Sequence, residues 1–561
     1  MNTFLKTYRL ALTPLSPIHI GCGEDFEPTN YVIDDGVLYG FDPSRAVLDD
    51  AQKRKLSDAA NKASLLALQQ FFKVNASLFK AQAEVLIPVS QGVAQVYEAR
   101  VGRAANIEAS GNVVFNQLFI ERAMHTGPRG WPFIPGSSLK GALRTAILDG
   151  LNSGQRVTRP EELDRRGAAK SDAVERRLLK GDFATSPLRL LKIADLMPHG
   201  EPSRRVMFAV NRKKKQVIKE GQEIQPKEGI AARKECILHG QYRAFVADAV
   251  LPSLDPHQEI KTTPAQELRP TDLREVAKLS NRYHLARLRS EFALLDGRGF
   301  VNPPWKQSLE ALLSGDLTKK LNDGDALLIR LGRYGGAESK TLSGDGVAQI
   351  KIMQGKGQQP VLQSTTKTVW LAAENEQEQK HLLPFGWALI EIDPQDDAPQ
   401  LKAWCAAESK GRRDMNQLRQ QFVAEKAEAH RRKTQLAAED ALREAAKQAE
   451  LLAAQQRALA LASMTVQGKL IESLRQKCED WFKHRPPNGN YRVQEANIGK
   501  AGLFQEANKL VTHALTGSDW TAADKKELAD MLDEWLPKAV APWGKDERKK
   551  LKLSALRGLG Q

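Results

Sequence analysis

The 561-residue sequence contains only four cysteines and no apolar run long enough to cross a bilayer. The cysteines are Cys22, Cys236, Cys405 and Cys478. They lack CxxC or Cys/His spacing, so neither a zinc site nor a disulfide framework is indicated. The N-terminal residues also lack the apolar core and small-residue cleavage site of a secretory signal. These absences predict a soluble protein of the reducing cytoplasm that has no membrane partner.

Several motifs that carry enzymatic chemistry are absent as well. The spacing GxxxxGK[ST] does not occur, which argues against binding of ATP or GTP in a Walker A loop. No GxSxG, Cys/His pairing or HExxH occurs, which argues against serine, cysteine and zinc hydrolases. We therefore expect neither a cofactor nor a metal, and no catalytic residue.

The charge of the chain is strongly positive. Lysine and arginine number 83 against 68 aspartates and glutamates, giving a net charge of +15 and an isoelectric point near 9.4. A basic surplus of this size favours a polyanionic partner, although a merely soluble basic protein is a common alternative. The length predicts several domains, each able to bury its own core.

Short strands and helices alternate without a regular βαβ repeat, which predicts an α+β fold. Alternating apolar residues predict a strand over 8–12, and Asp34-Asp35-Gly36 between two apolar runs predicts a β-hairpin. Apolar residues at helical spacing predict helices over 49–79 and 271–295. From 416 to 482 strong helix formers dominate without proline, which predicts a long helix or helical hairpin.

The segment WPFIPGSSLKGALRTAIL predicts a helix start with anion-binding chemistry. Pro135-Gly136 forces a turn, and Ser137 or Ser138 can cap the first amides. Lys140 and Arg144 are four residues apart, so they share a helix face near an N-terminus whose dipole favours an anion. A backbone phosphate would fit there, but an ordinary helix start with solvated charges fits equally well.

Three motifs in a fixed order give this segment a family context. They are SPIHIGCGED, IPGSSLKGALR and GRYGGAESKT, and the ordered matches around them span residues 12–342. In this order they resemble the RAMP proteins of CRISPR effector complexes and, within that superfamily, the fifth Csm subunit of type III-A systems. The resemblance implies ferredoxin-like, RRM-type domains with a long α-helical C-terminal extension. We accordingly expect domains over 1–200 (with a helical insertion), 201–398 (with the glycine-rich loop), 399–485 and 486–561.

The resemblance also implies a function. Such a protein binds the guide RNA (crRNA), caps its 3′ end and the backbone filament, and supports crRNA maturation in antiviral defence. Its partners would be the crRNA, target RNA through the crRNA, and the backbone and small helical Csm subunits; recruitment of a host nuclease for 3′ trimming is left open. The implied RNA contacts are His19, Gly21, Gly23, Gly136, Ser137, Ser138, Lys140, Arg144, Arg333, Gly335, Gly336, Ser339 and Lys340.

Two other functions stay open at the level of sequence. Glu24, Asp25 and Glu27 could hold a divalent metal for a RAMP endoribonuclease acting on guide or target RNA. His19 could alternatively serve as a general acid or base, or be a packed structural histidine. A pure assembly subunit that uses its C-terminal helices is the remaining alternative.

Overall fold

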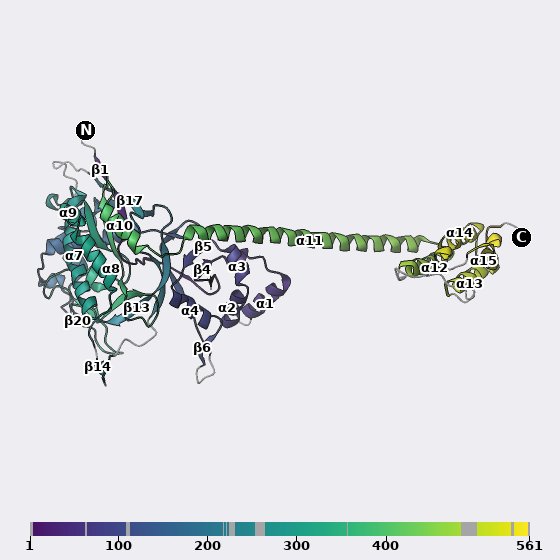
Figure 1. Ribbon diagram of the computed structural model, residues 1–561, viewed down its shortest axis with the longest axis horizontal. Helices are drawn as coiled ribbons and strands as arrows, with labels where there is room; N and C mark the ends of the chain where they lie inside the picture. The colour runs from purple at the N-terminus through teal and green to yellow at the C-terminus, as the bar shows by residue number, and fades with distance from the viewer. Residues whose placement is uncertain are drawn as a thin grey trace. The chain divides into compact units, whose positions relative to one another are not determined.

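The computed structural model describes residues 4–61, 64–107, 113–165, 167–216, 218–219, 221–223, 231–252, 264–355, 357–483, 502–539 and 543–558. The chain divides into two compact units, Met1–Arg431 and Arg432–Gln561 (Figure 1). The expected α+β class with a long helical C-terminal region is confirmed. Within those described ranges, no helix has the length and apolar character needed to cross a membrane.

Two six-stranded sheets form the centre of the first unit. The first sheet has the order β11 (Lys192–Ile193), β17 (Phe245–Pro252), β1 (Leu5–Pro14), β23 (Trp387–Ile392) and β18 (Ala326–Arg330), and β12 (Met197–Pro198) also pairs with β17. The second has the order β2 (Gly21–Phe26), β8 (Ile120–Ala123), β16 (Ala232–Ile237), β13 (Arg204–Lys213), β21 (Thr368–Ala373) and β22 (Leu383–Pro384). The predicted strand over 8–12 is thus part of β1.

The register of the first sheet brings distant segments to one edge. β1 and β18 are both antiparallel to β23, so they run in the same direction. Pro14 and Ile329 lie on either side of Ala388 in β23. The segments that follow β1 and β18 therefore leave the sheet at the same edge.

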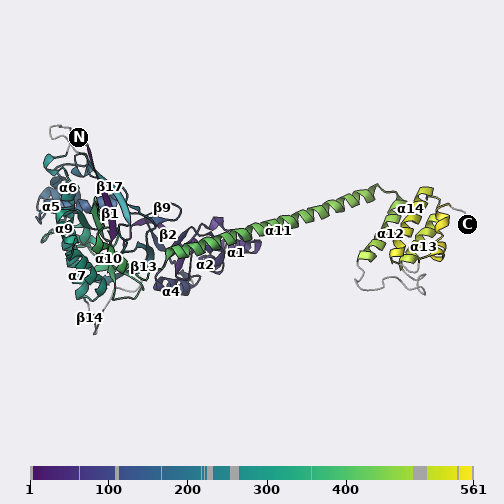
Figure 2. The same ribbon diagram turned by 45° about the horizontal axis from the view of Figure 1, so that its top comes forward.

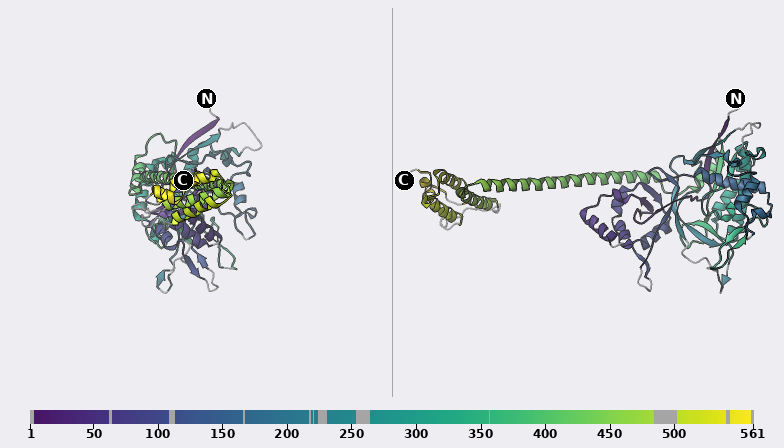
Figure 3. Two further views of the ribbon diagram at one scale, coloured as in Figure 1. Left: turned by 90° about the vertical axis from the view of Figure 1, so that its right-hand side faces the viewer. Right: turned by 180° about the vertical axis from the view of Figure 1, so that it is seen from behind.

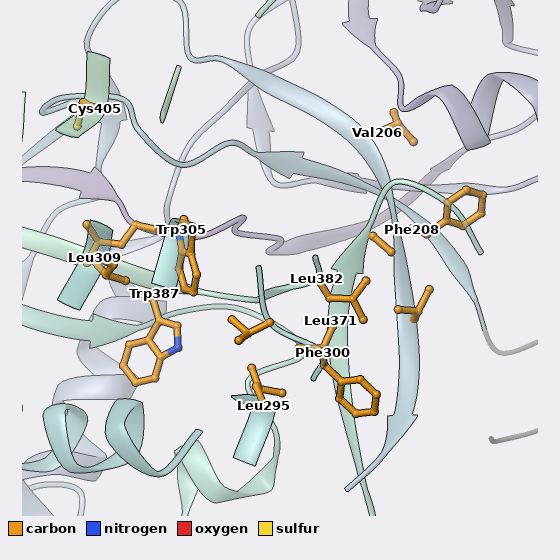
Figure 4. Close-up of a cluster of buried hydrophobic side chains, with 14 of the residues drawn as sticks. Val206, Phe208, Leu295, Phe300, Trp305, Leu309, Leu371, Leu382, Trp387 and Cys405 are labelled. Carbon is orange, nitrogen blue, oxygen red and sulfur yellow. Dashed lines mark hydrogen bonds between the residues drawn. The ribbon is translucent and has the colours of Figure 1, made fainter. Parts of the chain in front are cut away.

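Alternation along the strands separates two cores. Leu12 and Leu327 face a core with α5 (Gly136–Asn152) and the start of α7 (Leu273–Gly297). Leu328 and Leu389 face the opposite core, which the second sheet shares with α8 (Pro303–Ser314) and α9 (Leu317–Asp323). Figure 4 shows Trp387, Trp305 and Leu309 together in this second core. The sheet is thus buried on both faces and forms a rigid base for its loops.

A helical lobe projects from the first unit beside a small sheet (Figure 1; Figure 3, right). That sheet consists of β3 (Tyr31–Asp34), β4 (Val37–Gly40) and β5 (Val85–Pro88). The predicted hairpin is confirmed, because Asp35 and Gly36 have φ of 46° and 69° in the turn. The predicted helical stretch over 49–79 consists of α1 (Asp50–Asn61), α2 (Leu65–Val74) and α3 (Ala76–Gln82).

The remaining elements of this unit are short. The helices are α4 (Gln91–Arg100), α6 (Ser171–Leu178) and α10 (Pro399–Glu408). The two-stranded hairpins are β6–β7 (Ala104–Ile107, Val113–Phe115), β9–β10 (His125–Thr126, Trp131–Pro132), β14–β15 (Ile218–Lys219, Gln222–Glu223) and β19–β20 (Ile350–Ile352, Val361–Gln363). The helix predicted over 271–295 is α7, which Asp272 caps by accepting a bond from the Arg274 amide.

The expected boundary at residue 200 falls inside one compact unit. β1 comes from the segment before this boundary, yet both of its neighbours, β17 and β23, come from the segment after it. Pairing between strands that are distant in the sequence therefore joins the two expected domains. The boundary at 399 coincides with the start of α10, and the boundary at 485 lies outside the described residues.

The long helical region is α11 (Met415–Ser463) followed by α12 (Val466–Lys483). The tail contains α13 (Gly502–Thr516), α14 (Ala522–Ala539), α15 (Lys545–Lys550) and α16 (Leu553–Leu556). Figure 2 shows α12, α13 and α14 side by side. Leu474, Val511 and Leu532 from these three helices share one buried core, which gives the second unit its own stability.

Candidate functional site

Three segments that are far apart in the sequence surround one open cleft of about 700 Å³. They are the start of β2, the first turns of α5 and the loop after β18, and β8 also contributes to the wall. We call this the central cleft. Nine residues predicted to contact RNA line it: Gly21, Gly23, Ser137, Ser138, Arg144, Arg333, Gly335, Ser339 and Lys340. His19, Gly136, Lys140 and Gly336 do not line it.

His19 is a packing residue beneath the cleft. Its side chain is fully buried, and Nδ1 lies 2.7 Å from the backbone oxygen of Glu235. Because a carbonyl only accepts, Nδ1 carries a proton there. The His19 carbonyl in turn accepts a bond of 2.9 Å from the Arg333 amide. Burial leaves His19 no route to a bound strand, so the predicted RNA contact is replaced by support of the glycine-rich loop.

Gly136 has a packing role at the start of α5. A Cβ atom there would lie 2.4 Å from the Ile193 carbonyl oxygen, so only glycine fits. Its amide donates to the Asp195 carboxylate at 2.8 Å. The Ser138 amide is also engaged, by the Pro135 carbonyl at 2.9 Å. Two amides of the first turn are therefore already bonded within the protein, which weakens the predicted anion site.

The two serines do not cap the helix as the sequence predicts. α5 begins at Gly136 with Pro135 in the N-cap position, and neither serine side chain caps the helix. The hydroxyl of Ser137 is instead exposed at the cleft. The difference arises because the close approach of the 193–195 segment fixes the helix start one residue earlier than the serines.

Lys140 and Arg144 have different surroundings despite their helical spacing. The Arg144 Nε donates to Glu175 Oε1 of α6 at 2.7 Å, and a second bond joins the same two side chains. This carboxylate raises the pKa of Arg144 above its ordinary value. Burial and the neighbouring Lys192 lower the pKa of Lys140. Arg144 lines the cleft with its charge largely balanced, whereas Lys140 lies outside the cleft beside another cation.

The loop after β18 is held in an unusual backbone conformation. Gly332, Tyr334 and Gly336 all have positive φ, of 80°, 72° and 75°. A positive φ is uncommon for a tyrosine, and the Tyr334 ring is fixed by Trp370 and Phe385, each with its ring centre 5.2 Å away. The fold therefore compensates for backbone strain in order to present this loop to the cleft.

Two cations on this loop reach solvent. Lys340 is exposed, and no carboxylate within the described part of the chain forms an ion pair with it. Arg333 has a side chain 64% exposed and donates to Glu121 at 2.9 Å. Ser339 Oγ donates to the Gly335 carbonyl at 2.6 Å, so this hydroxyl stabilises the loop itself. Gly336 faces the Glu338 carboxylate rather than the cleft.

Glu121 is the ionic centre of the cleft wall. Its carboxylate contacts Arg333 and Lys234, and its Oε2 lies 3.6 Å from His19 Nε2. The imidazole of His19, followed by Lys234 and Arg333, holds the pKa of Glu121 at about 2 despite partial burial. Glu121 therefore stays ionised at any physiological pH and anchors Arg333.

Besides Glu121, three further residues of this region were not predicted from the sequence. Arg122 and Arg330 line the cleft, and Gly332 sits against His19 with space for no side chain. Gly332 lies within the quoted GRYGG motif, which could have identified it. The two arginines have no local signal, because their positions depend on strand pairing. In total, five basic and three acidic side chains line the cleft, which leaves a positive surplus of two.

Comparison with known proteins identifies relatives over part of the chain. Residues 11–249 match the model of the RAMP superfamily. The CRISPR protein Csm5 of Mycobacterium tuberculosis (strain CDC 1551 / Oshkosh) is 28% identical over 165 residues, covering 27% of this chain and 41% of the relative. Csm5 of Streptococcus thermophilus is 27% identical over 149 residues, covering 27% of this chain and 40% of the relative. The chain thus spans about two fifths of the length of these curated relatives.

Two solved structures are also similar. A chain in the cryo-EM structure of a Csm–crRNA–target RNA ternary complex from a type III-A CRISPR-Cas system has 16% identity and a TM-score of 0.41; the match covers 69% of this chain and all of that chain (100%). The crystal structure of T. onnurineus Csm5 has 15% identity and a TM-score of 0.34, and the match covers 68% of this chain and 99% of that chain.

Proposed function

We propose that this chain is the guide-RNA-binding subunit of a type III-A Csm complex. The proposal draws on the match of residues 11–249 to the RAMP superfamily and on the similarity of part of the chain to Csm5. In this proposal the central cleft holds the backbone of the crRNA near its 3′ end, and the chain caps the backbone filament. Its partners are the crRNA, target RNA paired with the crRNA, and the backbone and small helical Csm subunits.

The convergence of the three motifs carries the proposal. SPIHIGCGED, IPGSSLKGALR and GRYGGAESKT come from distant parts of the sequence, yet all three contribute residues to the central cleft. Packing of the hydrophobic core does not explain why the exposed side chains of Ser137, Arg333 and Lys340 lie at one cleft. A polyanionic strand lying in the cleft explains why hydroxyl and cationic groups gather there.

The chemistry of the cleft suits the RNA backbone rather than the bases. Glycines at positions 21, 23 and 335 let a strand approach the protein backbone, and Ser137, Arg333 and Lys340 offer donors to phosphates. Such contacts position RNA without reading its sequence. Guide and target then recognise each other by base pairing.

We expect the double variant Arg333→Ala/Lys340→Ala to weaken crRNA binding at least about tenfold, equally for unrelated guide sequences. Two phosphate contacts would be lost, so the slope of log affinity against log salt should become shallower by about 1.4. Titrations of labelled RNA at several salt concentrations measure both quantities. The matched control is Arg54→Ala/Lys55→Ala, which removes the same two charges from exposed positions in α1.

An unchanged affinity and slope in Arg333→Ala/Lys340→Ala would contradict the cleft assignment. An equal loss in the Arg54→Ala/Lys55→Ala control would show that the total charge, and not the cleft, determines binding.

We also propose that this chain does not cut RNA. Within the described residues, Glu24, Asp25 and Glu27 do not form a common group of potential metal ligands. His19, the other candidate, is buried and bonded to Glu235. Where 3′ trimming of the guide occurs, a host nuclease would perform it.

Incubation of the purified chain with guide or complementary target RNA and Mg²⁺ or Mn²⁺ should therefore leave the RNA intact. The same result is expected for Asp25→Ala. Metal-dependent cutting by the wild-type chain that disappears in Asp25→Ala would establish the endoribonuclease alternative instead.

A further inference from the structure

Cys22, Glu24 and His125 form a compact group at the edge of the central cleft. One ligand atom from each, a thiol sulfur, a carboxylate oxygen and an imidazole nitrogen, lie within 4.8 Å of one another. Glu24 Oε2 and His125 Nε2 are 3.8 Å apart. The sequence does not reveal this group, because Cys22 and His125 are about a hundred residues apart. Only the pairing of β2 with β8 brings them together.

An irregular strand pair builds the group. β2 pairs with β8 with Gly21 opposite Ala123 and Asp25 opposite Glu121, and the register shifts between these pairs. Gly23 lies within the shift with a φ of 86°. A β-bulge redirects the side chains on either side of it, here those of Cys22 and Glu24. His125 follows Ala123 by two residues and so reaches the same place.

The imidazole of His125 is oriented for coordination. Its Nδ1 lies 3.0 Å from the Ala123 carbonyl oxygen, which can only accept, so Nδ1 carries the proton. The lone pair therefore lies on Nε2, the atom that is near Glu24. A histidine ligand fixed through its other nitrogen by a carbonyl is the usual outer-shell arrangement of protein zinc sites.

We propose that Cys22, Glu24 and His125 bind a zinc ion. Thiolate, imidazole and carboxylate are all zinc ligands, and a tetrahedral site places such atoms roughly 3.5 Å apart, a small inward movement from the observed spacing. The thiolate and carboxylate balance the charge of the ion, and the thiol proton is released to solvent on binding. The fourth position remains open to water.

The neighbours of the group allow this occupancy. Arg122 lies near Glu24, with Nη1 3.1 Å from Oε2, and its guanidinium also stacks over the Phe26 ring at 4.5 Å. Glu24 has a second oxygen, so the carboxylate can bind zinc through one oxygen and Arg122 through the other. Its side chain is 63% exposed and free to make this rotation. The ion would tie β2 to the β9–β10 hairpin, whether or not the cleft binds RNA.

Titration of the full-length, chelator-treated protein with Co²⁺ tests the proposal. We expect one Co²⁺ per chain, a thiolate-to-cobalt charge-transfer band, the intense visible bands of a four-coordinate ion, and displacement by Zn²⁺. Cys22→Ser should abolish the charge-transfer band, and His125→Ala should lower Co²⁺ affinity at least about tenfold. The control His199→Ala changes an exposed histidine outside the group and should leave both unchanged.

Absence of stoichiometric Co²⁺ binding, or an unchanged charge-transfer band in Cys22→Ser, would overturn the zinc site. Zinc K-edge X-ray absorption of the wild-type protein gives a test that does not depend on the folding of a variant. One sulfur at about 2.3 Å with nitrogen or oxygen ligands at about 2.0–2.1 Å is expected. A shell of nitrogen and oxygen alone would exclude Cys22 and the proposal with it.

Discussion

Gly332→Ala should destabilise the first unit by several kcal/mol and lower crRNA affinity at least about tenfold. A Cβ atom at Gly332 would lie 2.4 Å from the His19 carbonyl oxygen and 3.1 Å from its carbonyl carbon. These are backbone atoms that cannot rotate away. The φ of 80° adds about 1–2 kcal/mol for any residue with a side chain. The loop must therefore lift from His19, which breaks the bond to the Arg333 amide and displaces Arg333.

Gly299→Ala is the matched control for this substitution. Gly299 also has a positive φ, of 65°, but a Cβ atom there would meet no atom within 4 Å. Gly299→Ala should lower the free energy of unfolding by only about 1–2 kcal/mol, the cost of a positive φ, and should leave RNA binding unchanged. Calorimetric unfolding and RNA titration measure both variants. Equal destabilisation by the two would show that the contact with His19 has no special importance.

Arg204→Met should cost about 3–5 kcal/mol of stability, because it leaves a buried carboxylate without its partner. Arg204 donates to Glu235 at 2.7 Å, and the two side chains are only 3% and 1% exposed. Arg204 also donates to the carbonyls of Arg129 and Gly130, and Glu235 accepts from the Ala123 amide at 3.0 Å. The pair thus joins β13 and β16 to the end of β8, which forms a wall of the cleft.

The next residue along the chain offers a matched control for this prediction. Arg205 pairs with Glu374, but these side chains are 34% and 38% exposed, so Arg205→Met should cost less than about 1 kcal/mol. The double variant Arg204→Met/Glu235→Met should recover part of the loss. Recovery stays incomplete because the Ala123 amide loses its acceptor. A cost for Arg204→Met no larger than that for Arg205→Met would refute the role given to the buried pair.

Local patterns in the sequence predict the local structure well. Asp34-Asp35-Gly36 predicts a hairpin, and the structure has positive φ at Asp35 and Gly36 in that turn. The apolar spacing over 271–295 predicts α7 to within two residues at either end. In each case the determining interactions are between residues close in the sequence, so they leave a pattern that can be read directly.

The partners of the candidate site residues could not be predicted in this way. Glu175 balances Arg144, and the 193–195 segment fixes Gly136, yet neither is near its partner in the sequence. The expected domain boundary at 200 lies inside one compact unit for the same reason, since both neighbours of β1 in the sheet, β17 and β23, follow it in the sequence. Only the order of three motifs in a known family indicated that the distant segments belong together; no local physical signal did so.

The structure also redefines how the C-terminal extension can be studied. A deletion after 398 would remove Leu401 and Trp404 of α10, which are buried in the core of the first unit. Assembly defects in such a protein would then reflect damage to this core. A truncation near the division at 431/432 preserves this core. The role of the C-terminal helices in assembly can then be measured separately from guide RNA binding by the first unit.

Crosslink mapping can show which residues of the chain lie against the 3′ end of the guide RNA. A crRNA with a photoreactive nucleotide near its 3′ end would be bound to the full-length chain, irradiated, and the attached peptides identified by mass spectrometry. We expect attachment to peptides that contain residues 137–145 or 331–340, and much weaker attachment when the reactive nucleotide is at the 5′ end. Attachment confined to other parts of the chain, or equal attachment from both ends, would contradict a cleft that holds the 3′ end of the guide.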